Sequence, residues 1–241
     1  MRLGLICMVC FQESGQPDDV RYMAELQDDG SFKLKCRNGH ETRIALQEQR
    51  FEYLMELAAN AILDGYFREA VVSFASSLER FIEFYIRVVL KNKNVRDEVI
   101  NTTWKQLSKQ SERQLGAYMM LHLAERGMTA PILSNEYVKL RNEVVHKGKV
   151  ASREEAIRYG NAVLITIIPT LEELKENYRD SIEAVTRNHI YTVHNAYTSG
   201  TVTSTMSYPT IVSLTRDWRV QQPDLITWLE QLEKRRAKIA W

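Results

Sequence analysis

The chain has 241 residues, of which 44% are hydrophobic and 26% are charged. This composition is ordinary for a globular protein and excludes wholesale disorder. The 32 Lys and Arg residues nearly balance the 31 Asp and Glu residues, so any nucleic-acid binding must come from a local basic patch. No apolar stretch reaches the ~18 residues of a membrane span, and the N-terminus lacks a signal-peptide cleavage region. We therefore expect a cytoplasmic protein with no membrane partner.

Residues 1–42 are expected to form a small zinc-ribbon-like segment. Residues 20–26 and 31–36 alternate roughly in polarity, and Asp28-Asp29-Gly30 supplies a turn between them, which predicts a β-hairpin. The three cysteines of the chain all lie in this segment. An odd, clustered set of cysteines in a protein expected to be cytoplasmic favours metal binding over disulfide bonds.

Four soft ligands flank the predicted hairpin. Cys7 and Cys10 form a Cys-x₂-Cys pair on one side, and Cys36 and His40 lie on the other. A Cys₃His set fills the four tetrahedral positions of a structural zinc ion and leaves no open position for catalysis. The alternative is that the three cysteines are buried or free and that His40 lies on the surface. A small zinc segment can act as a structural staple, an RNA contact or a protein contact.

Residues 43–180 are expected to form a helical bundle. Apolar residues recur at helical spacing over residues 51–62 and again over residues 71–89, and Asp64-Gly65 separates the two stripes. A less regular helical stretch covers about residues 97–126. A short helix is expected from Ser134 or Asn135 to about His146, and a last one follows the capping box Ser152-x-x-Glu155. Four or five amphipathic helices with short connections pack as a bundle.

Residues 181–241 are expected to form a C-terminal extension. Residues 190–215 are rich in Thr, Tyr, Val and Ser, which favours short strands or an extended arm around Ser199-Gly200. Pro223-Asp224 opens a terminal helix that ends in a basic run. The expected fold class is therefore mainly α, with a small N-terminal β-hairpin and a C-terminal extension of short strands and one helix.

The helix before Gly148 carries a cation, an amide and an imidazole close together. Asn142 and His146 are four residues apart and share one face, and the long side chain of Arg141 can reach the same groove. From residue 139 to residue 153 there are five basic residues against one acidic residue, Glu143. The basic residues of this stretch are Lys139, Arg141, Lys147, Lys149 and Arg153. This balance predicts a phosphate-binding patch.

The string Arg141-Asn142-x-x-x-His146 resembles the signature of HEPN domains, which carry it on a late helix of a four- or five-helix bundle. The resemblance covers about residues 43–180. It implies a metal-independent endoribonuclease that acts as a homodimer on RNA, in a toxin–antitoxin, stress or phage-defence system, with an antitoxin or defence protein as a further partner. Because Gly148 stands where toxins with a nucleotidyltransferase antitoxin carry Tyr, control by nucleotidylation is not implied.

The resemblance also implies a role for each residue of the motif. His146 acts as general acid or base, Arg141 stabilises charge on the scissile phosphate, and Asn142 orients the phosphate or the histidine. Glu79, on the polar side of the second predicted helix, resembles an acidic residue common on that helix in the family.

Two other functions remain open at the level of sequence. Many HEPN domains are non-catalytic modules that bind nucleotides or RNA or act as a scaffold in a defence complex, and Arg141 can instead pair with Glu136 or Glu143. The third possibility is a zinc-ribbon regulator that binds nucleic acid. Among the other histidines, His122 is expected in the core, and His189 and His194 lack nearby metal-ligating partners.

Overall fold

The computed structural model describes residues 1–16, 20–196, 202–216 and 224–238. Within these residues the chain forms nine helices and five strands, so the expectation of a mainly helical protein with small sheets is confirmed. No helix of the described part of the chain is both long and apolar enough to cross a membrane.

The chain divides into two compact units. Unit 1 comprises Met1–Gln49 and Ala184–Pro209, and unit 2 comprises Arg50–Glu183 and Thr210–Trp241. The boundary expected after residue 42 therefore falls after Gln49 instead. Residues 181–241 do not form one separate extension, because both units draw on this segment.

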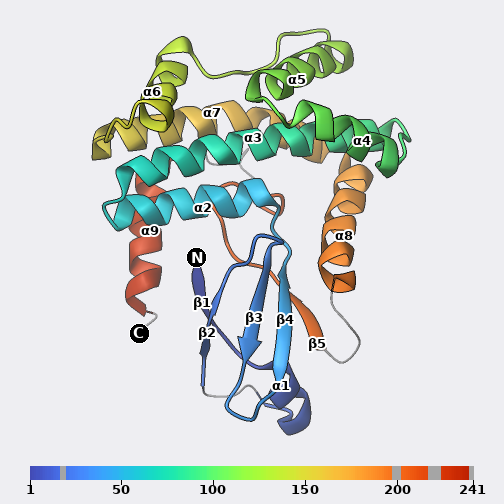
Figure 1. Cartoon of the computed structure of the whole chain (residues 1–241), viewed down its shortest axis with the longest axis vertical. Helices are drawn as coiled ribbons and strands as arrows, with labels where there is room; N and C mark the ends of the chain where they lie inside the picture. The colour runs from blue at the N-terminus through green and yellow to red at the C-terminus, as the bar shows by residue number, and fades with distance from the viewer. Residues whose placement is uncertain (17–19, 197–201, 217–223, 239–241) are drawn as a thin grey trace. The chain divides into compact units, whose positions relative to one another are not determined.

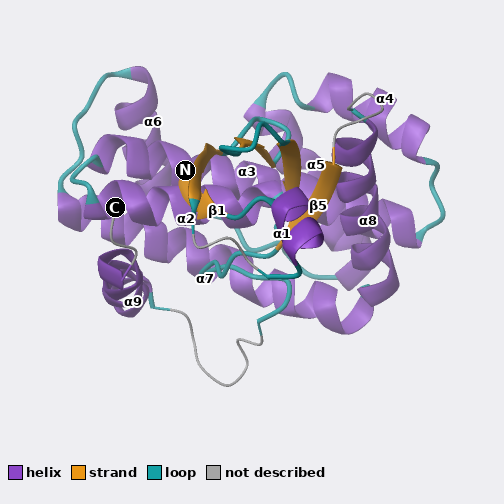
Figure 2. Cartoon of the chain, turned by 90° about the horizontal axis from the view of Figure 1, so that it is seen from below, coloured by secondary structure: helices purple, strands orange, loops and turns teal. Residues whose placement is uncertain are grey.

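Unit 1 is built from two small sheets, one short helix and residues 184–195 of a longer helix described below (Figures 1 and 2). The first sheet pairs β1 with β2 antiparallel, and the second has the order β3-β4-β5, with β3 antiparallel and β5 parallel to β4. In the second sheet Phe32 lies opposite Ile44, and both side chains are buried. The elements are β1 (Arg2–Leu5), α1 (Met8–Ser14), β2 (Tyr22–Glu25), β3 (Ser31–Lys35), β4 (Glu41–Leu46) and β5 (Val202–Met206).

The hairpin expected between residues 20–26 and 31–36 is present only as a bend. Gly30 donates to the carbonyl of Gln27, and a single bridge joins Leu26 to Phe32, after which β2 and β3 enter different sheets. In unit 1, sequence reasoning missed the strands β1 and β4 and the short helix α1. Residues 43–46 in particular are part of β4 and not of the helical bundle.

Unit 2 is a helical assembly centred on its longest helix, α3, which packs against α2, α4, α5, α6 and α7 (Figure 1). The stripe expected over residues 51–62 is the buried face of α2, where Phe51, Met55, Ala58 and Ile62 are at most 2% exposed. The helices are α2 (Arg50–Leu63), α3 (Phe67–Asn92), α4 (Asp97–Leu107), α5 (Ser111–Arg126), α6 (Asn135–His146), α7 (Arg153–Asn177) and α9 (Leu225–Lys238).

Several expected helix ends are where the sequence placed them. Gly65, Gly127 and Gly148 have φ angles of 79°, 66° and 70°, the left-handed conformation that glycine adopts at low cost after a helix. The Ser152–Glu155 capping box is formed in both directions at the start of α7. These signals act within a few residues of the chain. The helices that they were expected to end or start do end or start there in the structure.

Two helical expectations are wrong in detail. The stretch over residues 97–126 is two helices, α4 and α5, because the chain turns at residues 108–110. Residues 190–195 belong to α8 (Arg179–Asn195), which begins in unit 2 and ends in unit 1, so the strand-rich arm reduces to β5. Ser199-Gly200 and Pro223 lie outside the described residues, and the terminal helix is observed as α9.

The C-terminal helix α9 packs against α2 and α7 within unit 2. Leu225, Trp228, Leu229 and Leu232 of α9 are all at most 4% exposed. A Cβ atom at Gly160 of α7 would lie only 2.6 Å from the Leu225 side chain and 2.7 Å from Phe74. The absence of a side chain at Gly160 therefore permits this close approach.

Candidate functional site

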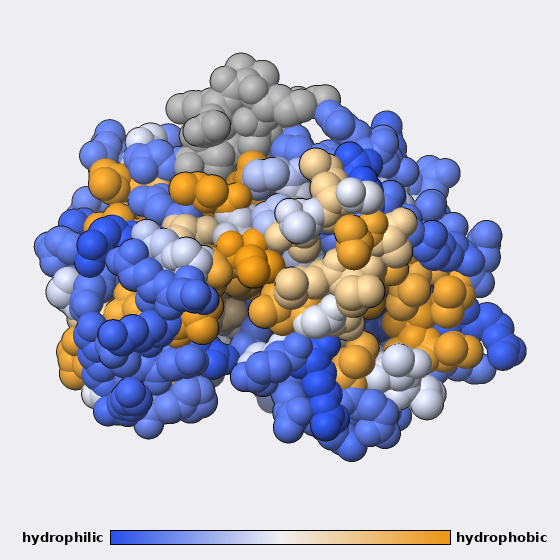
Figure 3. Space-filling view, turned by 90° about the horizontal axis from the view of Figure 1, so that it is seen from above, coloured by the Kyte–Doolittle hydropathy of each residue, from blue (hydrophilic) through white to orange (hydrophobic). Residues whose placement is uncertain are grey.

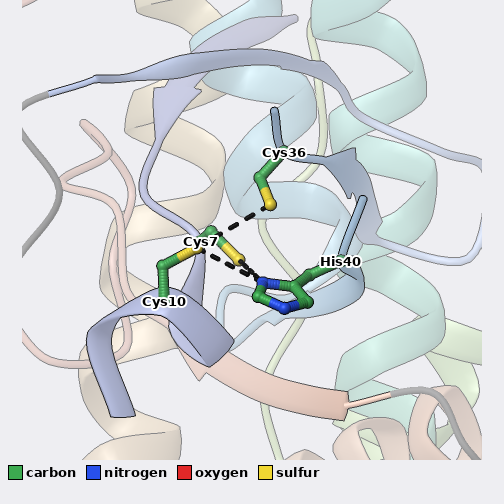
Figure 4. A group of neighbouring side chains, drawn as sticks. All are labelled: Cys7, Cys10, Cys36 and His40. Carbon is green, nitrogen blue, oxygen red and sulfur yellow. Dashed lines mark hydrogen bonds between the residues drawn. The ribbon is translucent and has the colours of Figure 1, made fainter. Parts of the chain in front are cut away.

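The four sulfur and nitrogen ligands expected from the sequence come together in unit 1. Cys7 lies just before α1 and Cys10 within it, Cys36 follows β3, and His40 precedes β4. The ligand atoms of the four residues all lie within 4.8 Å of one another. Figure 4 shows the three sulfur atoms and the imidazole directed toward a common point. These residues can therefore hold one metal ion.

The spacing of the ligand atoms fits a tetrahedral ion of the size of zinc. The Cys10 and Cys36 sulfur atoms are 3.8 Å apart. The Nδ1 atom of His40 lies 3.3 Å from the Cys10 sulfur and 3.9 Å from the Cys7 sulfur. A tetrahedron with Zn–S bonds of ~2.3 Å and a Zn–N bond of ~2.0 Å has S···S and S···N edges of ~3.8 and ~3.5 Å. Only small adjustments would admit the ion.

The surroundings of the cluster shift the pKa values of Cys10 and Cys36 in opposite directions. Burial raises the pKa of the Cys10 thiol to about 11, and its hydrogen bond with Cys7 acts in the same direction. Burial also acts to raise the pKa of Cys36, but hydrogen bonds from the backbone of His40 and Asn38 outweigh it, so the pKa falls to about 7. The Cys36 thiolate is therefore accessible near neutral pH, and it is the thiolate that binds a metal.

Two neighbouring side chains that the sequence did not single out support the ligands. The Asn38 amide donates to the Cys10 sulfur at 3.4 Å. The Nε2 atom of His40 faces the Glu13 carboxylate at 3.7 Å, which leaves Nδ1 toward the sulfur atoms. A carboxylate behind a ligating histidine is a common second layer of metal sites.

The second candidate site lies in unit 2, where Arg141 joins the other residues of the expected motif. Its guanidinium donates to the Asn142 side-chain oxygen at 3.0 Å and lies 3.4 Å from the His146 Nε2 atom. Its other terminal nitrogen pairs with Glu79 of α3 at 2.9 Å. We call Glu79, Arg141, Asn142 and His146 the Arg141 cluster. The pairing of Arg141 with Glu136 or Glu143, which the sequence left open, is not what the structure records.

The Arg141 cluster is open to solvent on one side. Asn142 and His146 are exposed, whereas the side chains of Arg141 and Glu79 are 23% and 31% exposed. Beneath them Tyr159 of α7 is buried, and its ring meets Tyr137 edge-on at 6.2 Å. Burial raises the pKa of Tyr159, so the phenol stays neutral beside the cluster; the charge of Arg141 opposes this shift and that of Glu79 adds to it.

The basic patch around the Arg141 cluster is partly neutralised. Lys149 lies 2.7 Å from Glu155 and 3.5 Å from Glu143, and its hydrogen bond to Glu155 raises its pKa. Lys139 and Lys147, in contrast, are exposed on the same stretch of chain. Positive charge therefore remains on the surface around His146.

A cavity of about 330 Å³ opens beside the Arg141 cluster. Its walls come from α3, α5, α6, α7 and the segment before α6, and they are mostly apolar. Glu79, Arg141 and Asn142 form part of its lining. No pattern in the sequence pointed to this cavity, because its walls come from segments far apart in the chain.

The remaining histidines have local partners. His122 is buried, its Nδ1 atom donates to the Met128 carbonyl oxygen at 3.2 Å, and its ring stacks near Tyr85, as expected for a core histidine. His189 lies 3.2 Å from the Leu46 carbonyl oxygen, and His194 contacts the Thr203 hydroxyl. Within the described residues neither His189 nor His194 belongs to a metal-ligating group.

Comparison with known proteins finds no match to a protein family, to a curated protein or to a solved structure. The function must therefore be argued from the two sites themselves.

Proposed function

We propose that the chain is a metal-independent endoribonuclease of the HEPN type, with the Arg141 cluster as its active site. The observation that carries the proposal is that the Arg141 guanidinium contacts all three other residues of the Arg141 cluster, at 2.9 to 3.4 Å. A guanidinium beside an imidazole is the pair of groups that phosphodiester cleavage requires, one for charge and one for proton transfer.

In the proposed reaction the 2′-oxygen of a ribose attacks the adjacent phosphorus and the bond from phosphorus to the 5′-oxygen breaks. The 2′-hydroxyl loses its proton and the leaving 5′-oxygen gains one, so the products are a 2′,3′-cyclic phosphate and a 5′-hydroxyl. An imidazole has one nitrogen that can accept a proton and one that can donate it, which suits His146 to either transfer. Arg141 binds the phosphate oxygens, and Asn142 orients the phosphate or His146.

A single chain supplies one imidazole to this reaction, whereas the reaction moves two protons. We therefore propose a two-fold dimer in which a second Arg141 cluster supplies the other proton-transfer group. Closed two-fold dimers are the commonest homo-oligomers. A role in phage defence or in a toxin–antitoxin or stress system, with a protein that restrains or activates the enzyme, belongs to the same proposal.

We also propose that the Cys₃His cluster of unit 1 binds structural zinc. The four side chains fill all four tetrahedral positions, so the ion would hold α1 and the loop before β4 together without taking part in the reaction.

The proposed activity is tested by cleavage of RNA without added divalent cations. His146→Ala is expected to lower the rate by roughly 10²–10⁴-fold because proton transfer is lost. Arg141→Ala is expected to cost about 10²–10³-fold because charge on the phosphate is no longer stabilised. DNA of the same sequence should not be cut, since it lacks the attacking hydroxyl, and the products should carry 2′,3′-cyclic phosphate ends.

The matched control is Lys139→Ala, which removes an exposed cation from the same helix outside the Arg141 cluster. It should change the rate little, and all three variants should melt close to the wild type because the altered side chains are exposed or partly exposed. Wild-type cleavage rates in both His146→Ala and Arg141→Ala would contradict the proposal.

One observation favours a second function, a non-catalytic module that binds nucleotides, RNA or a protein partner. The ion pair between Arg141 and Glu79 joins α6 to α3 and would serve equally well as a structural contact. If this role is the whole function, Arg141→Ala lowers the melting temperature while His146→Ala does not change the rate of RNA cleavage. The two functions are therefore separated by the same pair of variants.

A further inference from the structure

The apolar part of the cavity beside the Arg141 cluster has no part in the cleavage chemistry, which needs only the polar groups of that cluster, some of them at the edge of the cavity. It opens between α3, α5 and α6, and Phe81, Tyr118 and Tyr159 contribute to its inner wall. Those three side chains are at most 2% exposed, so their rings present only limited surface at the floor. A volume of about 330 Å³ is within the range of sites that bind a small ring-shaped group.

The rim of the cavity is apolar and open to solvent. Ile132, from the segment before α6, is 47% exposed, and Val138 of α6 is 42% exposed. Figure 3, which views the molecule from above, shows apolar residues exposed between hydrophilic ones on this side. Exposed apolar surface around a concave site marks a place where a partner with an apolar face binds.

Polar side chains of the Arg141 cluster form one part of the cavity lining, and the other polar side chains of the lining are Ser111, Glu112, Asn135 and Thr166. Arg141 and Asn142 belong both to the lining and to the cluster, whereas His146 belongs to the cluster alone. The amides of Asn142 and Asn135, both exposed, can donate and accept hydrogen bonds. A ligand that spans both places therefore carries a flat apolar ring with polar edges at a short distance from a phosphate.

We propose that this cavity binds an unpaired nucleobase next to the phosphate held by Arg141. The inference rests on the proposed function and specifies its substrate: the RNA must be able to unstack one base at the cleavage site. A base in a duplex is stacked and paired, so its ring cannot enter, whereas bases of single strands and loops are free to leave the stack. Apolar contacts would bind the ring of any base. Any preference for one base over another would then come from hydrogen bonds with the amides of Asn135 and Asn142.

The test separates binding from cleavage by using RNA whose 2′-hydroxyls are methylated and which therefore cannot be cut by 2′-oxygen attack. Fluorescence anisotropy should show that the single strand binds about tenfold or more tightly than the same sequence paired with its complement. A single abasic site, moved along the strand, should weaken binding at one position relative to the others. With unmodified RNA, the single strand should be cleaved at least tenfold faster than the duplex.

Two substitutions block the cavity from different walls without altering the Arg141 cluster. Ile132→Trp and Val138→Trp place a large ring at the rim, and each should weaken binding of the methylated single strand about tenfold. The matched control is Met120→Trp, because Met120 is 66% exposed on α5 and does not line the cavity. It should bind as the wild type does, and all three variants should retain the wild-type helical circular dichroism.

The base site is overturned if the methylated single strand and duplex bind equally, if neither binds, or if both rim variants bind like the control. Failure of the proposed function looks different, because the wild type would then bind the methylated strand with the expected preferences and leave unmodified RNA uncut. Cleavage without single-strand preference has the opposite meaning: the nuclease proposal holds and the base site does not.

Discussion

Arg141 is the residue on which the proposed site depends, and its contacts define what each neighbour does. The guanidinium fork reaches Glu79 with one nitrogen and Asn142 and His146 with the other. Two partly exposed side chains in water form only a weak ion pair, so the contact with Glu79 fixes orientation more than it adds stability. In the proposed enzyme Glu79 is therefore a positioning residue that acts through Arg141.

Glu79→Gln tests this positioning role, because the amide keeps an oxygen for Arg141 but loses the charge. We expect kcat to fall about tenfold, the equivalent of ~1.4 kcal/mol in the transition state. KM for RNA should stay unchanged or fall, since a negative charge near the substrate phosphate has been removed.

The control for this prediction is Glu83→Gln on the same helix, because Glu83 pairs with Arg80 and Arg87 and not with Arg141. Steady-state kinetics of the two variants should differ in kcat. Equal kcat values would show that Glu79 has no special relation to the reaction.

A second residue with an unusual environment is Glu56 of α2, whose side chain is fully buried. The Trp228 indole donates to it at 2.9 Å, and the Arg235 guanidinium lies 3.3 Å away. Burial raises the pKa of Glu56 from 4.5 to about 7, and the charge of Arg235 only partly offsets this. Both partners belong to α9, so this carboxyl group helps to hold the C-terminal helix in unit 2.

The raised pKa makes the stability of unit 2 depend on pH in a defined direction. Below about pH 4.5 Glu56 is protonated in both states, and between about 4.5 and 7 the unfolded state loses its proton first, so stability falls as pH rises. Glu56→Gln cannot titrate. Its free energy of unfolding relative to the wild type should therefore rise across this window, by up to about 3 kcal/mol.

Urea unfolding followed by tryptophan fluorescence at pH 5, 6, 7 and 8 measures this difference. The free energy of unfolding of Glu56→Gln minus that of the wild type should increase with pH and become constant above about pH 7. Parallel pH profiles would mean that Glu56 titrates alike in the folded and unfolded chain, contrary to the prediction.

At the scale of elements, helices with a strong apolar stripe and a glycine stop could be predicted from the sequence. The apolar residues from Phe51 to Ile62 lie on one face of α2. Gly65 follows the helix in the structure, as the sequence predicts. β1 and β4 could not be predicted in the same way, because a strand of four to six residues is defined by its partners. The partner of β4 on one side is β5, which lies far along the chain.

The candidate sites show the same division between local and distant signals. Cys7 and Cys10, and Arg141 and His146, are close in sequence, and their grouping could be predicted from spacing alone. Glu79 lies 62 residues from Arg141, and only the family resemblance suggested it. The cavity walls and the supporting Glu13 and Asn38 carried no sequence signal, since nothing in their own segments marks them.

The packing of α9 on α7 gives a prediction about an element. Alanine is usually the better helix former than glycine by about 1 kcal/mol. At Gly160, however, a methyl group would lie 2.6 Å from Leu225 and 2.7 Å from Phe74, which is closer than carbon atoms approach. Gly160→Ala should therefore destabilise unit 2 by about 1–3 kcal/mol, because overpacking outweighs helix propensity.

Gly116 of α5 is the matched control, since it is exposed and a methyl group there would meet no atom within 4 Å. Gly116→Ala should raise the melting temperature slightly, whereas Gly160→Ala should lower it, both measured by circular dichroism. Equal shifts of the melting temperature in the two variants would show that α9 moves to accommodate the added methyl group at little cost.

At the scale of the whole molecule, the division into units follows contacts and not the order of the chain. The residue composition and the spacing of apolar residues change near residue 42 and again near residue 181, and those changes suggested three consecutive parts. The structure instead returns residues 184–209 to the N-terminal unit, where β5 extends the β3-β4 sheet. Parallel pairing of β4 with β5 leaves no local pattern, because the two strands are more than 150 residues apart.

The division into two units predicts which part of the chain should unfold when the proposed zinc ion is removed. Trp104 and Trp228, the tryptophans in the part of the chain that the structure describes, are both buried in unit 2, so their fluorescence reports on that unit. Removal of zinc by a chelator, or Cys36→Ser, should unfold unit 1, because the segments that carry the four ligands are then no longer joined through one ion. Hydrogen exchange should rise in residues 1–49.

Exchange should rise in β5 as well, although β5 lies far from the cysteines in sequence, because it pairs with β4 in the same unit. The urea midpoint seen by tryptophan fluorescence should stay unchanged, since unit 2 has its own core around α3. Adding zinc back should restore protection in the chelated wild type but not in Cys36→Ser. Protection that survives chelation in β5 while residues 1–42 exchange freely would instead support a zinc segment that folds independently of the C-terminal strand.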